Sequence, residues 1–201
     1  MTREEQLAHL DRAIVLAPER ASYRETHAIY AIDLRRFETA AADLDTAIQL
    51  ADRPYLRFLR GLVSCQRGEF EGSLSEFDRA IREQPTNTQF YRGRSLARSR
   101  TGRYRKALED AERLVAQVPQ QAESHYALGI ALTGLGRFDE AVEALGEAMR
   151  RRPELLYPLR ARAEAYDRLG DRERAAADLA ELARRERDES LCATCRDPFR
   201  Y

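Results

Sequence analysis

A pattern of glycine, aromatic, alanine and proline residues recurs along this chain at intervals of thirty-four residues. The clearest copy runs from Ala122 to Pro153 and reads AESHYALGIALTGLGRFDEAVEALGEAMRRRP. Apolar residues at helical spacing precede Gly134 and Gly136, and a second apolar stripe at the same spacing follows Phe138. Each copy is therefore predicted to form two helices joined by a tight turn. Because such a pair cannot bury its apolar face alone, neighbouring copies are expected to stack.

The register of this repeat organises nearly the whole chain into one predicted array. Residues 4–20 correspond to a half repeat, and five further repeats follow at 21–53, 54–87, 88–121, 122–155 and 156–189. A short tail, residues 190–201, ends the sequence. The predicted fold class is all-α, with about eleven helices arranged as an α-solenoid.

Two columns of the repeat surround the turn between paired helices. A glycine is expected to end each first helix in a left-handed conformation, which costs least without a Cβ atom: Gly68, Gly102, Gly136 and Gly170. In the first repeat Arg35 stands in this place, and that repeat is one residue short. Two positions later comes an aromatic ring, predicted to wedge between the paired helices: Phe37, Phe70, Tyr104 and Phe138.

Charge and hydropathy exclude several classes of partner. The 34 basic and 34 acidic residues cancel, so no long-range positive field favours nucleic acid or an anionic membrane. No apolar run approaches the roughly 18 residues of a membrane span. The amino terminus is charged from its third residue and lacks the apolar core of a signal peptide, so a cytoplasmic location is expected.

Motifs for catalysis or metal binding are missing from the sequence. It contains no Gly-x-Ser-x-Gly elbow, no phosphate-binding glycine-rich loop and no His-Glu-x-x-His. His9, His27 and His125 are isolated from other metal ligands. The prediction is a protein that is not an enzyme, with no catalytic residue, no cofactor and no metal.

Cys192 and Cys195 form a Cys-x-x-Cys in the tail. A zinc site needs four ligands, and no second pair is present. Three interpretations stay open: a tail with no special role, a metal shared with a partner or a second subunit, and a redox dithiol.

One pair of columns changes together between repeats. An arginine stands sixteen residues before an acid three times: Arg60 with Glu76, Arg94 with Asp110, and Arg162 with Asp178. The other repeats have His27 with Asp43 and Leu128 with Ala144 in the same places. On antiparallel helices this spacing places the two residues opposite each other, so ion pairs between the paired helices are predicted.

The repeats resemble tetratricopeptide repeats, which are thirty-four-residue helix-turn-helix units. The segments LGIALTGLGRF and DEAVEALGEAMRRRP match the leucine–glycine, phenylalanine, alanine and proline spacing of that family most closely, and the likeness covers residues 4 to about 189. It implies a right-handed superhelix whose first helices line a concave groove, and it implies no catalysis.

Carrying the family's geometry onto this chain predicts which residues line that groove. They are the first-helix residues that point away from the second helices: Ile29, Tyr55, Phe58, Leu62, Arg92, Leu96, Arg100, Tyr126, Ile130, Tyr157 and Arg160. The predicted function is a protein-protein interaction module or adaptor that binds a peptide or helix bearing apolar and acidic residues. The alternative is a structural scaffold that assembles by stacking copies through the ends of the array.

Overall fold

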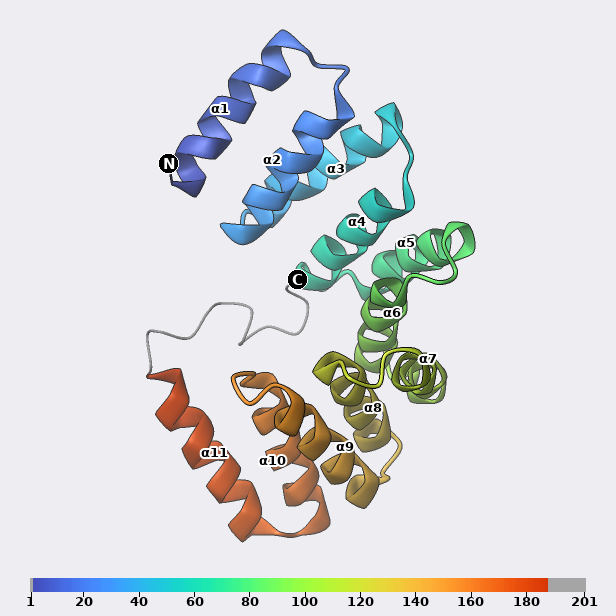
Figure 1. The fold of residues 1–201 in the computed structure, drawn as a ribbon, viewed down its shortest axis with the longest axis vertical. Helices are drawn as coiled ribbons and strands as arrows, with labels where there is room; N and C mark the ends of the chain where they lie inside the picture. Colours follow the sequence, from blue (N-terminus) through green and yellow to red (C-terminus); the bar gives the residue numbers. More distant parts are fainter. Residues whose placement is uncertain (1, 188–201) are drawn as a thin grey trace. The chain divides into compact units, whose positions relative to one another are not determined.

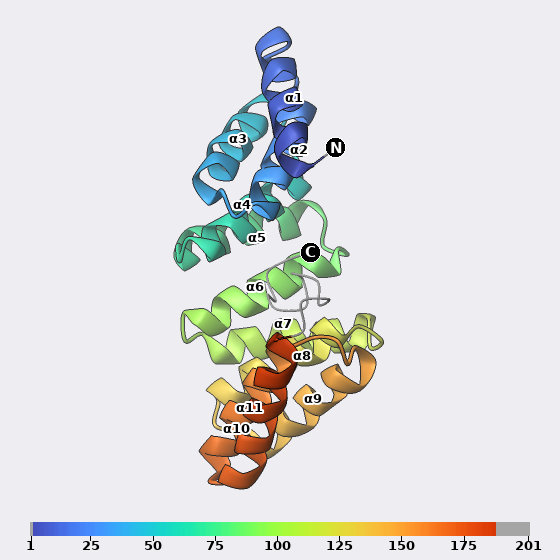
Figure 2. The same ribbon diagram turned by 90° about the vertical axis from the view of Figure 1, so that its left-hand side faces the viewer.

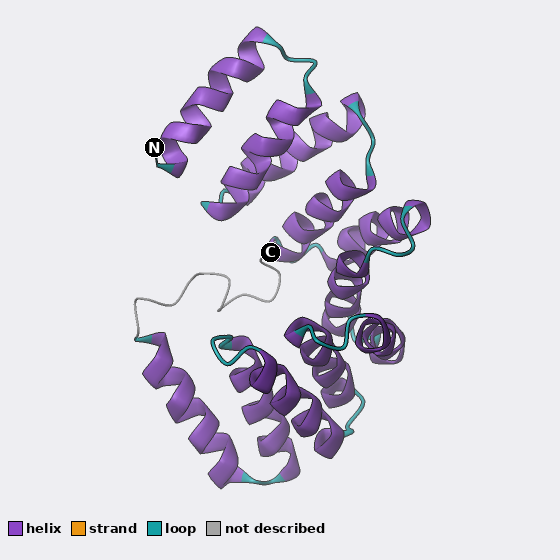
Figure 3. Ribbon diagram, in the orientation of Figure 1, coloured by secondary structure: helices purple, strands orange, loops and turns teal. Residues whose placement is uncertain are grey.

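The structure, a computed structural model, describes residues 2–187. Every regular element in this range is an α-helix (Figure 3). The chain divides into two compact units, Met1–Phe90 and Tyr91–Tyr201. The first unit holds α1 (Arg3–Leu16), α2 (Ala21–Asp33), α3 (Phe37–Leu50), α4 (Pro54–Gln66) and α5 (Phe70–Glu83). Helix α6 (Thr88–Arg100) begins just before the boundary and is followed by α7 (Tyr104–Gln117), α8 (Ala122–Gly134), α9 (Phe138–Arg151), α10 (Tyr157–Leu169) and α11 (Arg172–Glu186). These eleven helices confirm the predicted all-α fold of paired helices.

Within each unit, consecutive helices pack against one another (Figures 1 and 2). In the first unit α2 pairs with α3 and α4 pairs with α5, while α1 packs against α2 and α3 packs against α4. In the second unit α8 pairs with α9 and α10 pairs with α11, while α7 contacts α8 and α9 contacts α10. The first helices α8 and α10 also touch each other, so one face of the second unit is built from first helices.

The turn inside each helix pair has the predicted left-handed residue. The glycines Gly68, Gly102, Gly136 and Gly170 have φ values of 78°, 72°, 77° and 82°. After α8, the Arg137 N–H donates to the Leu132 carbonyl at 3.0 Å, which satisfies a carbonyl left over at the helix end. The first repeat forms the same turn with Arg35 at φ 59°, and the Arg36 N–H donates to the Ala31 carbonyl at 2.8 Å. Arg35 therefore adopts a left-handed backbone conformation, which is less favourable for a residue with a Cβ atom than for glycine.

Paired helices approach closely where a small residue faces a large one. A Cβ atom on Gly61 would lie 2.6 Å from the ring of Phe77, and a Cβ atom on Gly129 would lie 2.5 Å from Cγ of Leu145. Phe77 and Leu145 are fully buried, so they fill the space between their helices. Ser95 occupies the equivalent position on α6, where its hydroxyl donates to a backbone carbonyl of α7.

The prediction that the turn aromatics wedge between paired helices is wrong for Tyr104 and Phe138. The Tyr104 ring lies against Gly134, where a Cβ atom would come within 2.0 Å of it. The Phe138 ring lies 5.0 Å from the guanidinium of Arg168 on α10. Both rings are only half-buried and reach the next helix pair, because each stands at the first residue of its helix, beside the end of the following first helix.

Two of the predicted arginine–acid pairs meet in the structure. Asp110 accepts hydrogen bonds from Arg94 Nε at 3.0 Å and Nη2 at 2.7 Å, and Asp178 is held by Arg162 in the same bidentate way. The equivalent His27 contacts Asp43 through Nδ1. In each case the bond joins the two helices of a pair.

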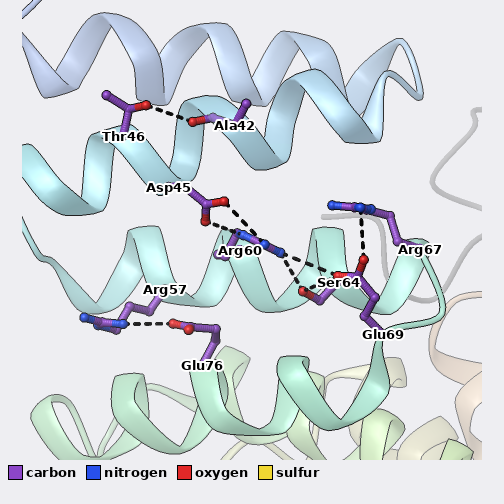
Figure 4. A network of polar contacts seen from close by, with 9 residues as sticks. All are labelled: Ala42, Asp45, Thr46, Arg57, Arg60, Ser64, Arg67, Glu69 and Glu76. Carbon is purple, nitrogen blue, oxygen red and sulfur yellow. Dashed lines mark hydrogen bonds and ion pairs between the residues drawn. The ribbon is translucent and has the colours of Figure 1, made fainter.

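The third prediction, that Arg60 pairs with Glu76, is wrong (Figure 4). Arg60 instead donates from Nε to Asp45 of α3 at 2.6 Å and from Nη1 to the Ser64 hydroxyl. Glu76 accepts from Nη1 of Arg57 at 3.0 Å. Arg57 stands almost one turn before Arg60 on α4 and is 8% exposed, and the carboxylates of Asp52 and Glu76 both pair with its guanidinium.

Candidate functional site

The second unit contains a hollow of about 660 Å³ over its first helices. Six of the residues predicted for the groove line it, two each from α6, α8 and α10: Leu96, Arg100, Tyr126, Ile130, Tyr157 and Arg160. Tyr104 of α7 and Leu182 of α11 complete parts of the wall. The six predicted side chains that the structure brings together lie up to sixty-four residues apart in the sequence.

Helical spacing directs these side chains to one face. Tyr126, Ile130 and Gly134 recur at intervals of four residues on α8, so they form a row along that helix. The same columns hold Leu96 and Arg100 on α6, and Arg160, Glu164 and Arg168 on α10. The hollow thus follows the thirty-four-residue repeat, with successive first helices each contributing one row.

The floor of the hollow is apolar and aromatic. The rings of Tyr126 and Tyr157 meet edge to face with centroids 4.5 Å apart, a favourable geometry for two aromatic rings. They are 6% and 8% exposed, so they are held in place by packing. Burial, and next the carboxylate of Glu123, raise the pKa of the Tyr157 hydroxyl, which therefore stays protonated at neutral pH. Leu96 and half-buried Ile130 add aliphatic surface beside the rings.

Charged side chains surround this apolar floor. Arg160 donates to Glu186 at 2.8 Å, and both side chains are largely exposed. The guanidinium of Arg168 lies over the Phe138 ring, while exposed Arg100 makes no ion pair with any residue in the range 2–187. Three arginines and two glutamates, Glu164 and Glu186, therefore form a rim with a positive balance.

Gly134 and Arg168 are among the lining residues that the sequence prediction missed. Gly134 leaves room that the Tyr104 ring partly fills. The repeat itself contains the signal that identifies both residues, because Gly134 and Arg168 follow Arg100 at steps of thirty-four. Extending the Arg100 column down the chain would have found them.

Arg92 was predicted for the groove but does not line the hollow. Its side chain is half-buried at the start of α6. Burial lowers the pKa of its guanidinium, and the carboxylate of Glu123 partly offsets this effect. Glu123 also accepts a hydrogen bond from Arg152 at 2.9 Å.

The groove residues predicted in the first unit have a different environment. Phe58 is fully buried, with its ring centroid 6.1 Å from those of Tyr55 and Phe77 and 5.2 Å from that of Phe90. Leu62 is 3% exposed. Phe58 is therefore a core residue, and its assignment to an accessible groove is wrong. Tyr55 and Ile29 are half-buried on α4 and α2.

The other sequence predictions concern metals, membranes and the tail. Within residues 2–187 no three histidine, cysteine or acidic side chains converge as a metal site would require. In the same range no helix has both the length and the apolar character of a membrane span. Cys192 and Cys195 lie outside the described residues, as does the predicted tail 190–201.

Solved structures of repeat proteins share this fold. MamA from Desulfovibrio magneticus RS-1, residues 41 to its end, is 20% identical with a TM-score of 0.67, over 85% of this chain and 97% of that one. MamA of AMB-1 is 23% identical with a TM-score of 0.59, over 87% and 94% of the two chains. YrrB, described as a TPR protein with an unusual peptide-binding site, is 20% identical with a TM-score of 0.61, over 90% and 94%.

Sequence comparison assigns the family directly. No curated protein matches the chain significantly. The family model for the tetratricopeptide repeat matches residues 26–88 and 92–155, which together exceed half of the sequence. These segments coincide with helix pairs that have the turn, close approach and spacing described above. The chain belongs to the tetratricopeptide-repeat family.

Proposed function

We propose that this protein is a non-catalytic interaction module that binds a peptide segment or partner helix in the hollow of its second unit. The observation that carries the proposal is the convergence of α6, α8 and α10 on one hollow with an apolar floor and a charged rim. The bound segment places apolar side chains on Tyr126, Ile130 and Tyr157. Its acidic side chains face the arginines of the rim.

The size and chemistry of the hollow support this proposal. Its volume of about 660 Å³ lies within the range of about 300–1,000 Å³ typical of ligand sites. Tyrosine and arginine, which each contribute three side chains to its lining, are among the residue types that most often carry binding energy at protein interfaces. The lining contains no histidine and no cysteine, so no nucleophile is paired there with an imidazole base. YrrB, which has a similar fold, is described as having a peptide-binding site.

The experiment starts from a peptide library displayed on phage and selected on the folded protein. A selected peptide is labelled with fluorescein, and its Kd is measured by anisotropy. Ile130→Glu should weaken binding by about 10- to 100-fold, because it introduces a charge at the centre of the apolar floor. Leu135→Glu is the matched control, since Leu135 is 37% exposed at the α8–α9 turn and does not line the hollow. Equal effects of the two changes would refute the proposed site.

A second candidate function is a scaffold in which copies of this chain stack through their ends. Leu179 on α11 favours it, because Leu179 is 51% exposed whereas Leu44, Phe77 and Leu145, at the equivalent position of three other helix pairs, are fully buried. A second copy covering Leu179 would restore the burial that this column has elsewhere. Light scattering against concentration tests this idea: Leu179→Ser should reduce any association, and a monomer at every concentration would exclude it.

A further inference from the structure

Positive charge is concentrated around the α6–α7 turn. Residues 84–108 contain seven cationic side chains and no acidic one, although the whole chain has equal numbers of each. The seven are Arg92, Arg94, Arg98, Arg100, Arg103, Arg105 and Lys106. A local surplus of this kind sets a local potential even when the net charge of the protein is zero.

Some of these cations form ion pairs within the fold, and others do not. Arg94 and Arg98 both donate to the buried carboxylate of Asp110. Arg100, Arg105 and Lys106 are exposed, and none of them makes an ion pair with another residue of the range 2–187. We call these three residues the basic turn.

The basic turn includes charges that are unfavourable for the helix that carries them. Arg105 and Lys106 stand in the first turn of α7, where the positive end of the helix dipole disfavours cations. The equivalent first turns of the other second helices each contain an acid: Glu38 in α3, Glu71 in α5, Asp139 and Glu140 in α9, and Glu173 in α11. Two cations in a first turn that has no acid therefore lower the stability of α7, which is understandable if they serve binding.

The basic turn continues directly from the edge of the hollow. Arg100 belongs to both, and Tyr104, which also lines the hollow, immediately precedes Arg105. A segment anchored in the hollow therefore reaches the basic turn within a few residues. On the α10–α11 side Arg160 is already paired with Glu186.

We infer that the basic turn is the docking surface for an acidic stretch of the peptide whose apolar side chains occupy the hollow. The inference rests on the function proposed above and adds a direction to it: the apolar anchor lies on α8 and α10, and the acidic stretch runs over the α6–α7 turn. An acidic peptide fits better than a nucleic acid, because the apolar floor beside the turn accepts side chains and the chain has no net positive charge.

The test uses two synthetic peptides that share an apolar anchor of phenylalanine and leucine with a glycine spacer. One continues with six glutamates and the other with six glutamines, and each is labelled for anisotropy. The wild-type protein should bind the glutamate peptide about tenfold more tightly, as expected for a few surface ion pairs, and added salt should remove the difference. Arg105→Glu with Lys106→Glu should abolish the preference.

Two controls make this variant informative. Arg79→Glu with Arg82→Glu changes the net charge by the same amount at exposed positions of α5, and it should keep the preference. The turn variant copies the acidic start of α9, so it should unfold at the same or a higher temperature than the wild type. A variant that melts at this temperature and loses binding has not lost it through unfolding.

The outcomes separate this inference from the function on which it rests. A glutamate preference that survives in the turn variant, or that is lost equally in the α5 control, would overturn the inference alone. If Ile130→Glu leaves binding of both peptides unchanged while the turn variant loses the preference, the hollow fails as the anchor and the basic turn stands as an acidic docking surface. Tighter binding of an oligothymidylate than of the glutamate peptide would overturn the choice of a peptide partner.

Discussion

Arg162 holds Asp178 through two parallel hydrogen bonds, from Nε at 2.8 Å and from Nη2 at 2.7 Å, and so joins α10 to α11. Asp178 is 7% exposed, so its charge is largely removed from water. Hydrogen bonding to this carboxylate raises the pKa of the Arg162 guanidinium. Such a pair adds little net stability compared with an apolar pair of similar size, yet breaking it from one side is costly.

The first prediction follows from this asymmetry. Arg162→Leu should lower the free energy of unfolding by about 2–4 kcal/mol, because it leaves the Asp178 carboxylate buried without its partner. Arg162→Leu with Asp178→Ala imitates Leu128 and Ala144, the combination already present in the preceding repeat, and should recover a large part of that loss. Chemical denaturation of the four proteins gives the coupling energy. Additive effects would show that the two side chains do not depend on each other.

The second prediction concerns the turn of the first repeat. Arg35→Gly should raise the stability by about 1 kcal/mol, because Arg35 has φ 59° and glycine adopts this conformation without a Cβ penalty. Gly136→Ala is the mirror experiment at φ 77°, where a Cβ atom would meet no other atom within 4 Å. It should destabilise by a similar amount through conformation alone. Thermal unfolding measures both, and a neutral Arg35→Gly would mean that the arginine side chain compensates for its backbone.

The third prediction separates two phenylalanines that look equivalent in a hydropathy plot. Phe77→Ala should cost about 3–5 kcal/mol, because Phe77 is fully buried and its ring faces Gly61 across the helix pair. Phe138→Ala should cost distinctly less, about 1–2 kcal/mol, since its ring is half-buried against Arg168. Urea denaturation of both variants is the measurement. A larger loss for Phe138 would restore the role between paired helices that the structure gives to Phe77.

The fourth prediction concerns pH. Hydrogen bonds from Arg184 and Arg185 lower the pKa of the Glu181 carboxyl from 4.5 to about 2. A carboxyl whose pKa is lower in the folded state stabilises the fold above its unfolded pKa and loses that contribution as the pH falls through the folded value. Stability should therefore decline from about pH 4.5 towards pH 2. Carboxyl NMR of Glu181 should give a midpoint near 2, and Arg184→Gln with Arg185→Gln should raise it; a wild-type midpoint above 4 would contradict the bonds.

The repeat columns predicted the helices and the central rows of the hollow because they report backbone geometry directly. A turn glycine marks the end of a first helix, and residues sixteen apart face each other across one helix pair. Both patterns therefore follow from the geometry of a single helix-turn-helix unit. The rows through Leu96 and Ile130 were found in the same way, since residues thirty-four apart occupy equivalent places on successive first helices.

The side-chain environment was harder to predict, because it depends on what the next helix places nearby. Phe58 belongs to the same column as Tyr126, but Phe90 packs on Phe58. The positions equivalent to Phe90 on the following first helices are the smaller Ser124 and Pro158, and there the hollow is open. The partner of Glu76 was equally hard to predict, since Arg57 and Arg60 stand on the same helix and the sequence does not tell that Arg57 bonds to Glu76 while Arg60 bonds to Asp45.

The most direct test of the proposed function is amide hydrogen exchange of the whole protein with and without a peptide selected from the library. Binding in the hollow should slow exchange in three separate segments, residues 96–100, 126–134 and 157–168, and leave α2 unchanged. The three segments share no local sequence, so their joint protection would locate the peptide on the face formed by α6, α8 and α10. Protection confined to the first unit or to α11, with these three segments unaffected, would contradict the account.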